Sequence, residues 1–426
     1  MTYAQSADVI EQLMSQLFDM SALAPMPQHG ASAETVLGEL AQRKAHDPDF
    51  HSNHLFGLVY QTERAELERV VAQANEMYLW GNALNIVKFP NLTRLEFEVV
   101  AMVGDLLHLP QGGGGTMTSG GTESILMSML VNRERAKARG VDKPQILAPY
   151  SAHPAYAKAA KLLEMEYATF ALDGDYRADV GAARAAVTPR TAVIVANAMS
   201  FPYSSIDPIP ELAALAMEHG IGCHVDACIG GFVLPFLERL GYDVPPWDFR
   251  VPGVTEISAD VHKYGYASKG SSVILHRDSD WVAHQFFMFG DWPSGLYGTP
   301  AVPGARPATT MATAWAVLKH LGIDGYVELT RQAMETTTKI RAAIEAIPDL
   351  YIVGKPIGTT LAFGSNTVDI HQVGDVLSDK GWHLDRNVEP PSLHMMVSPG
   401  HRLVVDQFLA DLNEAVVQGT LSFRGA

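Results

Sequence analysis

The segment from Ile257 to Ser272 places a lysine where covalent chemistry is possible. It begins like a strand and then runs into His262-Lys263, which aromatic residues and glycines flank. A lysine at a strand end in partly desolvating surroundings can have a lowered pKa and can form a Schiff base with a carbonyl compound. Taken alone, the segment is more typical of an exposed loop lysine, so the chemistry needs support from other residues.

An acid upstream supplies a second part of the same chemistry. The run from Gly222 to Asp226 ends in a carboxylate at another predicted strand end. A carboxylate there can pair with a pyridinium nitrogen, keep it protonated and make the ring an electron sink. Alone, Asp226 fits a helix or turn cap equally well. An acid followed by a lysine is the order that we expect of a pyridoxal phosphate enzyme.

A glycine-rich stretch from Gly112 to Ser124 could bind the phosphate of such a cofactor. Small residues let backbone N–H groups approach an anion, and the helix predicted from Ile125 to Ala138 adds the positive end of its dipole. Thr122 and Ser124 offer hydroxyl donors. The stretch is neither a Walker A loop nor a dinucleotide fingerprint, and a flexible turn explains it as well.

His153 is the fourth candidate. It follows a strand-like run that ends at Pro149, and it precedes Pro154, a favourable first residue of a helix. An imidazole at this position could stack on a planar cofactor. It could equally cap the helix or lie on the surface.

The elements around these residues predict that they meet. From about Leu92 to Leu275, short apolar runs alternate with helical stretches, which favours an α/β fold with a largely parallel sheet covered on both faces. Ligands of such sheets collect at the carboxyl ends of the strands. The clearest predicted strands are Gln145–Pro149, Thr191–Ala196, Ile221–Asp226 and Ser271–Leu275.

The rest of the chain is predicted to support this domain. Residues 1–80 are predicted to be a helical arm, residues 81–310 a large cofactor-binding domain, and residues 311–426 a smaller α+β domain. The Gly- and Pro-rich stretch from Gly290 to Pro307 is predicted to be a long irregular loop with a function. The expected helices in these regions are Ser32–Lys44, Glu63–Tyr78, Ala308–Leu321 and one near Arg402–Gln418.

The amino-acid composition limits the classes of partner that the protein can bind. The 426 residues are 47% hydrophobic and carry a net charge of −16 without a basic run, which excludes a disordered chain and argues against nucleic acid as a partner. Cys223 and Cys228 suffice for neither a disulfide framework nor a metal site. Because the first basic residue is Arg43 and no apolar run has membrane-spanning length, we expect a cytoplasmic protein without a membrane span.

At the candidate residues the chain resembles the sphingosine-1-phosphate lyase family, in the group II decarboxylase branch of fold-type I pyridoxal phosphate enzymes. The likeness begins near Pro27 and continues into the small domain. The matching segments are Thr118–Leu126, Ser151–His153, Phe201-Pro202, Ile206–Pro210, His224–Phe232, Ser258–Tyr266, Lys269–Ser272, Gly304–Pro307, Gly381-Trp382 and Pro390–His394.

The resemblance implies a set of residue roles and an aspartate aminotransferase-like fold. Pyridoxal 5'-phosphate would be attached to Lys263, with Asp226 at its pyridine nitrogen and His153 stacked on its ring. It also implies a homodimer with shared active sites and a substrate that has an anionic head. The remaining implied residues are Gly121, Thr122 and His262 at the cofactor phosphate, Tyr297 and Gly298 reaching in from the other subunit, and Tyr203 and Lys269 on the substrate side.

The implied reaction is retro-aldol cleavage of a phosphorylated or otherwise anionic 2-amino-3-hydroxy compound to an aldehyde and an amine. In the family reaction the amine is phosphoethanolamine, a product of sphingolipid metabolism. The chain departs from the family at Asn85-Ile-Val-Lys88, where relatives carry His-Pro-Asp before the Phe-Pro that is Phe89-Pro90 here. That histidine belongs to the region expected to contact the substrate phosphate. The substrate therefore stays open: Lys88 could replace the charge, or the head could be a carboxylate or another small polar group.

Two other functions are compatible with the same residues. An amino-acid decarboxylase on the same scaffold would release carbon dioxide in place of an aldehyde. A binding protein that retains the cofactor fold without turnover is the third hypothesis.

Overall fold

A seven-stranded sheet forms the centre of the computed structural model, which describes residues 15, 25–84 and 87–424. The strand order is β1-β7-β6-β5-β4-β2-β3. The run from β3 to β6 is parallel, whereas β7 is antiparallel to both of its neighbours. The predicted α/β class with a mostly parallel sheet is confirmed. The strands are β1 Gly114–Thr118, β2 Gln145–Pro149, β3 Glu166–Phe170, β4 Thr191–Asn197, β5 Gly222–Asp226, β6 Glu256–Ala259 and β7 Ser272–His276.

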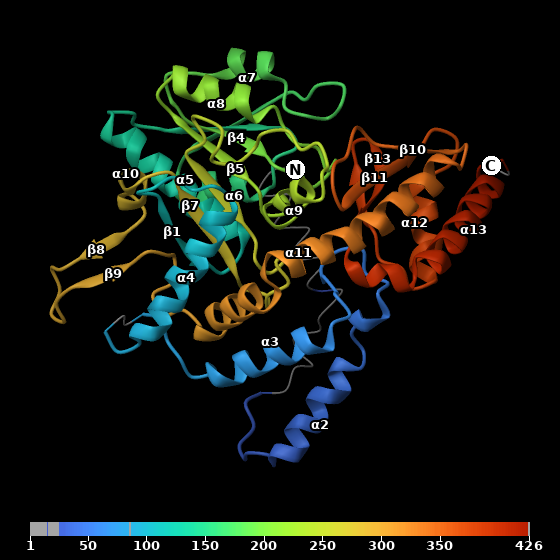
Figure 1. The fold of residues 1–426 in the computed structure, drawn as a ribbon, viewed down its shortest axis with the longest axis horizontal. Coiled ribbons are helices and arrows are strands. Elements are labelled where there is room, and N and C mark those ends of the chain that lie inside the picture. The colour runs from blue at the N-terminus through green and yellow to red at the C-terminus, as the bar shows by residue number, and fades with distance from the viewer. Residues whose placement is uncertain (1–14, 16–24, 85–86, 425–426) are drawn as a thin grey trace. The chain divides into compact units, whose positions relative to one another are not determined.

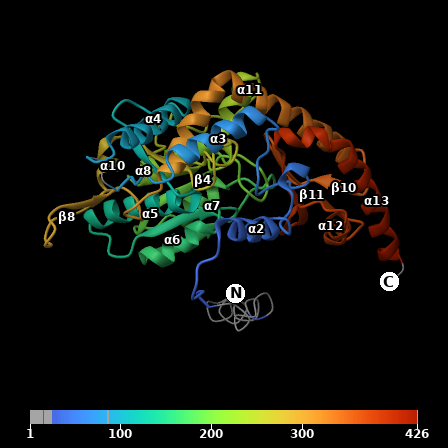
Figure 2. The same ribbon diagram turned by 90° about the horizontal axis from the view of Figure 1, so that it is seen from below.

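Helices cover both faces of this sheet, as Figures 1 and 2 show. One face packs α5 and α6, whose core side chains include Ile125 and Tyr156. The other face packs α4, α8, α9 and the first part of α11 in the largest apolar core. β4 is buried along its whole length and is apolar from Ala192 to Ala196, as expected of a strand that is covered on both faces. The helices are α3 Ala65–Met77, α4 Pro90–Leu106, α5 Gly121–Ala138, α6 Ala155–Leu163, α7 Val180–Ala186, α8 Ile209–Glu218, α9 Leu234–Arg239, α10 Ser279–Ala283 and α11 Ala308–Glu345, with short 3₁₀ helices at Phe50–Ser52 and Gly230–Phe232.

The stretch from Gly290 to Pro307 is less irregular than predicted. Residues Tyr297–Thr299 form β9, which pairs with β8, Phe287–Phe289, in an antiparallel hairpin. The hairpin projects away from the central sheet (Figure 1). Each strand has only three residues, and Phe287–Phe289 shows no alternation of apolar and polar residues, so the sequence does not reveal the strand pair.

A second, four-stranded sheet lies near the carboxyl terminus in the order β10-β11-β13-β12. Its core includes Trp382 and Phe408, together with Ile340 and Ile344 from the end of α11. The predicted helix from Ala308 ends at Leu321 as expected, because Gly322 has non-helical backbone angles with φ at +58°, and a second helix follows it directly within α11. The elements are β10 Leu350–Ile352, β11 Thr360–Ser365, α12 Ile370–Asp379, β12 Asp385–Val388, β13 Pro391–Met396, a 3₁₀ helix at Pro399–Leu403 and α13 Val405–Arg424.

The described residues up to Asp49 belong to a separate compact unit. Its helix α2, Ala33–Lys44, confirms the predicted helix, and the hydroxyl of Ser32 caps it by accepting a hydrogen bond from the Thr35 N–H. Within the described ranges of the chain, no helix combines the length and the apolar character needed to cross a membrane.

Candidate active site

A cavity of about 490 Å³ lies at the carboxyl ends of β4, β5 and β6. Its volume falls in the range of small-molecule and cofactor sites. Each strand delivers polar groups to it, because Asn197 ends β4, Asp226 ends β5 and Asp260 follows β6. The predicted residues that line it are Gly121, Thr122, His153, Asp226, His262, Lys263 and Lys269.

Lys263 forms a buried ion pair that the sequence prediction did not include. Its Nζ lies 3.0 Å from Oδ2 of Asp260, whose side chain is only 2% exposed. Burial disfavours the ammonium, but the Asp260 carboxylate raises the pKa of Lys263 above its usual value. The expectation that desolvation would lower this pKa is therefore wrong for the chain alone, because sequence does not reveal the counter-ion.

Asp226 and His153 line the cavity from separate strand ends. The Asp226 side chain is largely buried, and its Oδ1 accepts a hydrogen bond of 3.0 Å from the Cys228 N–H. The Nδ1 of His153 accepts a hydrogen bond of 3.1 Å from the Ala155 N–H at the start of α6. The helix-capping alternative for His153 is thus realised, and it fixes the ring while the rest of the imidazole faces the cavity.

The glycine-rich loop turns into α5 beside the lysine. Helix α5 begins at Gly121, four residues before the predicted start, so Thr122 lies in its first turn. A Cβ at Gly121 would lie 2.8 Å from Sγ of Cys228 and 2.9 Å from Oδ2 of Asp260, so only glycine fits there. Ser124 does not face the cavity, because its hydroxyl is buried against Thr118 and Ser272.

His262 and Lys269 lie on the loop that carries Lys263. Nδ1 of His262 accepts a hydrogen bond of 3.2 Å from the Ser271 N–H, which leaves Nε2 to act as a donor. Nζ of Lys269 donates to the His262 carbonyl at 3.1 Å and lies 4.8 Å from the centre of the Tyr60 ring. Desolvation and the nearby Lys263 lower the pKa of Lys269 to about 8.

Three predicted residues lie away from this cavity. The Tyr203 hydroxyl donates to the Glu389 carbonyl at 2.5 Å, and burial raises the pKa of Tyr203 to about 12. Tyr297 and Gly298 lie on β9 of the projecting hairpin. Within one chain, Tyr297 and Gly298 therefore do not reach the cavity that contains Lys263.

The segment that departs from the family is described only in part. Asn85 and Ile86 lie outside the described residues, whereas Lys88 lines a separate groove with Trp80 and Phe89. Within one chain, Lys88 is thus not among the residues of the main cavity.

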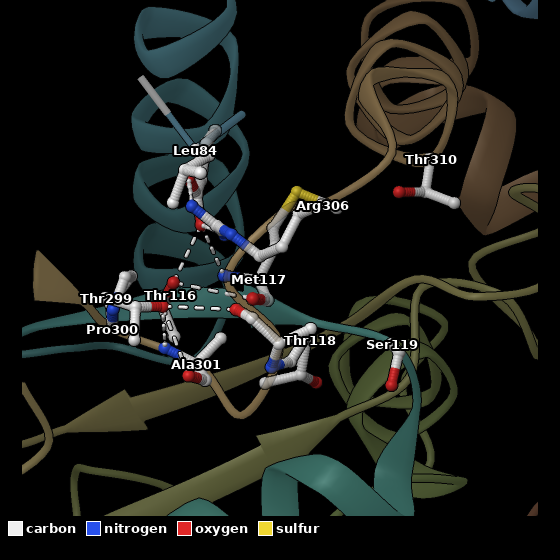
Figure 3. Close-up of polar contacts among 12 residues, drawn as sticks. Leu84, Thr116, Met117, Thr118, Ser119, Thr299, Pro300, Ala301, Arg306 and Thr310 are labelled. Carbon is white, nitrogen blue, oxygen red and sulfur yellow. Dashed lines mark hydrogen bonds and ion pairs between the residues drawn. The ribbon is translucent and has the colours of Figure 1, made fainter. Parts of the chain in front are cut away.

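Two carboxylates that sequence reasoning missed attach the loop before α11 to the glycine-rich loop. Glu96 forms a two-point ion pair with Arg306 and accepts hydrogen bonds from the Thr116 hydroxyl and the Met117 N–H. Figure 3 shows Thr116, Met117 and Arg306 meeting at these contacts.

Glu123 makes a similar connection. It accepts hydrogen bonds from the N–H and hydroxyl of Ser119 and from the Val302 N–H. Ser119 and Glu123 are four residues apart, which is not the capping-box spacing, and nothing in the sequence reveals the contact between Glu123 and Val302.

These residues fit pyridoxal 5'-phosphate. The Gly121 position, which excludes a side chain, and the start of α5 offer an anion cradle, and His262 adds a ring N–H beside it. An amine, a carboxylate and an imidazole occupy the walls of the same cavity.

Comparison with known proteins identifies the family. Residues 29–365 match the model of the pyridoxal-dependent decarboxylase conserved domain. The chain is 41% identical to a sphingosine-1-phosphate lyase of Arabidopsis thaliana over 97% of this chain and 77% of that protein. It is 39% identical to sphingosine-1-phosphate lyase 1 of Rattus norvegicus over 96% of this chain and 73% of that protein. The chain belongs to the sphingosine-1-phosphate lyase family. It is a pyridoxal 5'-phosphate-dependent lyase, as the resemblance implied.

Comparison with solved structures supports the assignment of this chain to the sphingosine-1-phosphate lyase family. The sphingosine-1-phosphate lyase of Burkholderia pseudomallei superposes with a TM-score of 0.90 at 38% identity, covering 95% of each chain. The glutamate decarboxylase of Lactobacillus brevis superposes with a TM-score of 0.82 at 20% identity, covering 95% of this chain and 97% of that one, which shows a shared fold. The predicted fold-type I architecture is confirmed, and the lyase prediction is favoured over the decarboxylase alternative.

Proposed function

We propose that this lyase cleaves the C2–C3 bond of a 2-amino-3-hydroxy compound with an anionic head, releasing an aldehyde and an amine. The observation that carries the proposal is the meeting of Lys263, Asp226, His153 and the start of α5 in one cavity. The names of the relatives add support, because sphingosine 1-phosphate is such a compound.

We propose the residue roles that the family resemblance implies, and the lining of the cavity supports them. Lys263 would hold the cofactor covalently, Asp226 would bind its pyridine nitrogen, and His153 would stack on its ring. Gly121, Thr122 and His262 would bind its phosphate. When bound, pyridoxal 5'-phosphate supplies an electron sink for the bond that breaks.

Lys263 has a second role during turnover. As a free amine, its Nζ, which borders the cavity, would accept or return a proton there. Whenever Asp260 is ionised, its carboxylate, 3.0 Å away, would stabilise the ammonium form of this amine. Because Asp260 is buried, water competes little for this interaction.

Lys269 would bind the anionic head of the substrate. It faces the same cavity as Lys263, and its cation lies over the Tyr60 ring. Tyr203 would act indirectly on the substrate side, because its hydroxyl, on the loop after β4, donates to the Glu389 carbonyl in the turn between β12 and β13.

We further propose a homodimer with shared active sites. The β8–β9 hairpin exposes Phe287, Met288 and Phe289, each by about half of its surface, which is unfavourable in water. Tyr297 and Gly298 lie on this hairpin, so a second copy could receive them near its own cavity. A two-fold dimer is also the commonest assembly of soluble oligomers.

Two broader expectations remain proposals. One is the division into an arm to residue 80, a large domain to residue 310 and a small domain from residue 311; the presence of two separate sheets supports two domains after the arm. A cytoplasmic location is supported by Cys223 and Cys228, which are buried free thiols.

A substrate panel tests the function. Purified protein loaded with the cofactor is given phosphorylated 2-amino-3-hydroxy compounds, their carboxylate analogues and ordinary amino acids. Aldehyde release in proportion to enzyme supports the lyase proposal. Carbon dioxide without aldehyde across the panel would establish a decarboxylase, and neither product would favour a binding protein.

A further inference from the structure

Asp260 lies between the cofactor lysine and the anion cradle. Its Oδ2 is 3.0 Å from Nζ of Lys263 and 3.6 Å from Nε2 of His262. Both of its oxygens lie within 3.0 Å of the point where a Cβ of Gly121 would stand. Its Oδ1 is buried without a hydrogen-bond partner among the described residues. A buried carboxylate therefore borders the place where a phosphate is to bind.

The negative charge of the Asp260 carboxylate and that of the cofactor phosphate would repel each other. A lysine must also lose its proton before its amine can attack a carbonyl carbon. Transfer of one proton resolves both problems: an N–H bond of Lys263 breaks and an O–H bond forms on Asp260. The ion pair becomes a neutral amine and a neutral acid. An anion in the cradle favours this transfer, because it raises the free energy of the neighbouring carboxylate.

We propose that Asp260 is a positioning residue that holds Lys263 as an ammonium in the cofactor-free chain and accepts its proton when the cofactor attaches. The inference rests on the proposed role of Lys263. Burial disfavours the carboxylate, but Lys263 and His262 lower the pKa of Asp260, in agreement with an ion pair before attachment. The other titratable groups acting on the pair are Tyr60, Cys228, His262 and Lys269, and Asp226 and His153 line the same cavity.

The test measures covalent attachment in the full-length cofactor-free protein across pH. Attachment is trapped with borohydride, and the labelled residue is identified by peptide mass. In Asp260→Asn the buried Lys263 loses its counter-ion, so its pKa falls below the usual value. The midpoint of the pH profile should therefore move to lower pH by more than about one unit, which is a tenfold change in the neutral amine.

A second comparison isolates the phosphate. The first-order attachment rate at saturation is measured for pyridoxal 5'-phosphate and for pyridoxal without phosphate. The wild type should attach the phosphorylated aldehyde at least about tenfold faster at neutral pH, and Asp260→Asn should abolish most of that difference. Equal rates for the two aldehydes in the wild type would overturn the proton-transfer step.

Control variants distinguish proton transfer to Asp260 from a purely structural role of this residue. The identity of the labelled residue tests the proposed function separately. Asp385→Asn removes another cavity carboxylate, whose ion pairs are with His383 and His394, and should leave the midpoint unchanged. Asp260→Glu retains the charge, so it should keep the wild-type midpoint even if it folds less well. A lower yield in Asp260→Asn with an unchanged midpoint would refute the inference. A label on a residue other than Lys263 would refute the proposed function instead.

Discussion

The guanidinium of Arg306 and the carboxylate of Glu96 form a buried ion pair between the loop before α11 and helix α4. Nη2 and Oε2 lie 2.9 Å apart, and both side chains are less than a tenth exposed. The Arg306 carbonyl also accepts a hydrogen bond from the Ala83 N–H. The side chain of Arg306 thus connects the loop before α11 to helix α4, and its backbone connects the same loop to Ala83.

Breaking this pair should destabilise the fold strongly. Glu96→Gln leaves the Arg306 charge buried without a carboxylate, a change that typically costs about 3–5 kcal/mol. Urea unfolding of the cofactor-loaded protein measures the loss. Arg184→Met, which removes an exposed pair with Glu218, should change the free energy of unfolding by less than about 1 kcal/mol. Similar small effects in both variants would show that the buried pair does not anchor the loop.

Much of the site was predictable because strand ends and motifs are local. Asp226, His153, Lys263 and the start of α5 each follow an apolar run or glycines, and the sheet topology brings them together. The ion pairs were not predictable. Glu96 is an ordinary acid within a helix until the fold brings it to Arg306, which lies far along the chain.

Asp260 illustrates a different limit. It belongs to the motif that ends in Lys263, three residues later, so its position was visible. Its burial and its distance to Nζ decide its role, and neither follows from the sequence pattern. Similarly, the hydroxyl of Tyr203 donates a hydrogen bond to the carbonyl of Glu389 in the turn between β12 and β13, a contact that no local signal encodes.

Replacing Lys263 by Ala should abolish covalent attachment of the cofactor. Borohydride treatment of the wild type should label Lys263, and visible absorption of the linked cofactor should disappear in the variant. Turnover should fall on the order of 10³-fold or more, because the proton-transferring amine is lost as well. In Lys269→Ala, borohydride should still label Lys263. Lys269 only donates a hydrogen bond to the His262 carbonyl, so its removal leaves the amine of Lys263 in place. A persistent covalent adduct on another lysine would contradict the role given to Lys263.

Substrate binding should weaken as pH rises through about 8. Desolvation and Lys263 lower the pKa of Lys269 to about 8, so its ammonium is present below that pH and is lost above it. If the ammonium binds the anionic head, KM should rise on the alkaline side of about pH 8 while kcat changes little. Lys269→Arg keeps its charge at all these pH values, so its KM should stay flat. A kcat that rises with pH at constant KM would instead identify Lys269 as a base.

The apolar tip of the hairpin should hold two subunits together. Phe287 and Phe289 expose 56% and 47% of their surfaces on β8, so replacing both by Ser removes apolar contact area without opening the core of the chain. We expect the double variant to sediment as a monomer and to lose activity in the same proportion, because Tyr297 and Gly298 would no longer reach a second cavity. Met217→Ser, at an exposed apolar position on α8, should leave the mass and the activity unchanged. Circular dichroism verifies the fold in each case, and a fully active monomer would contradict shared active sites.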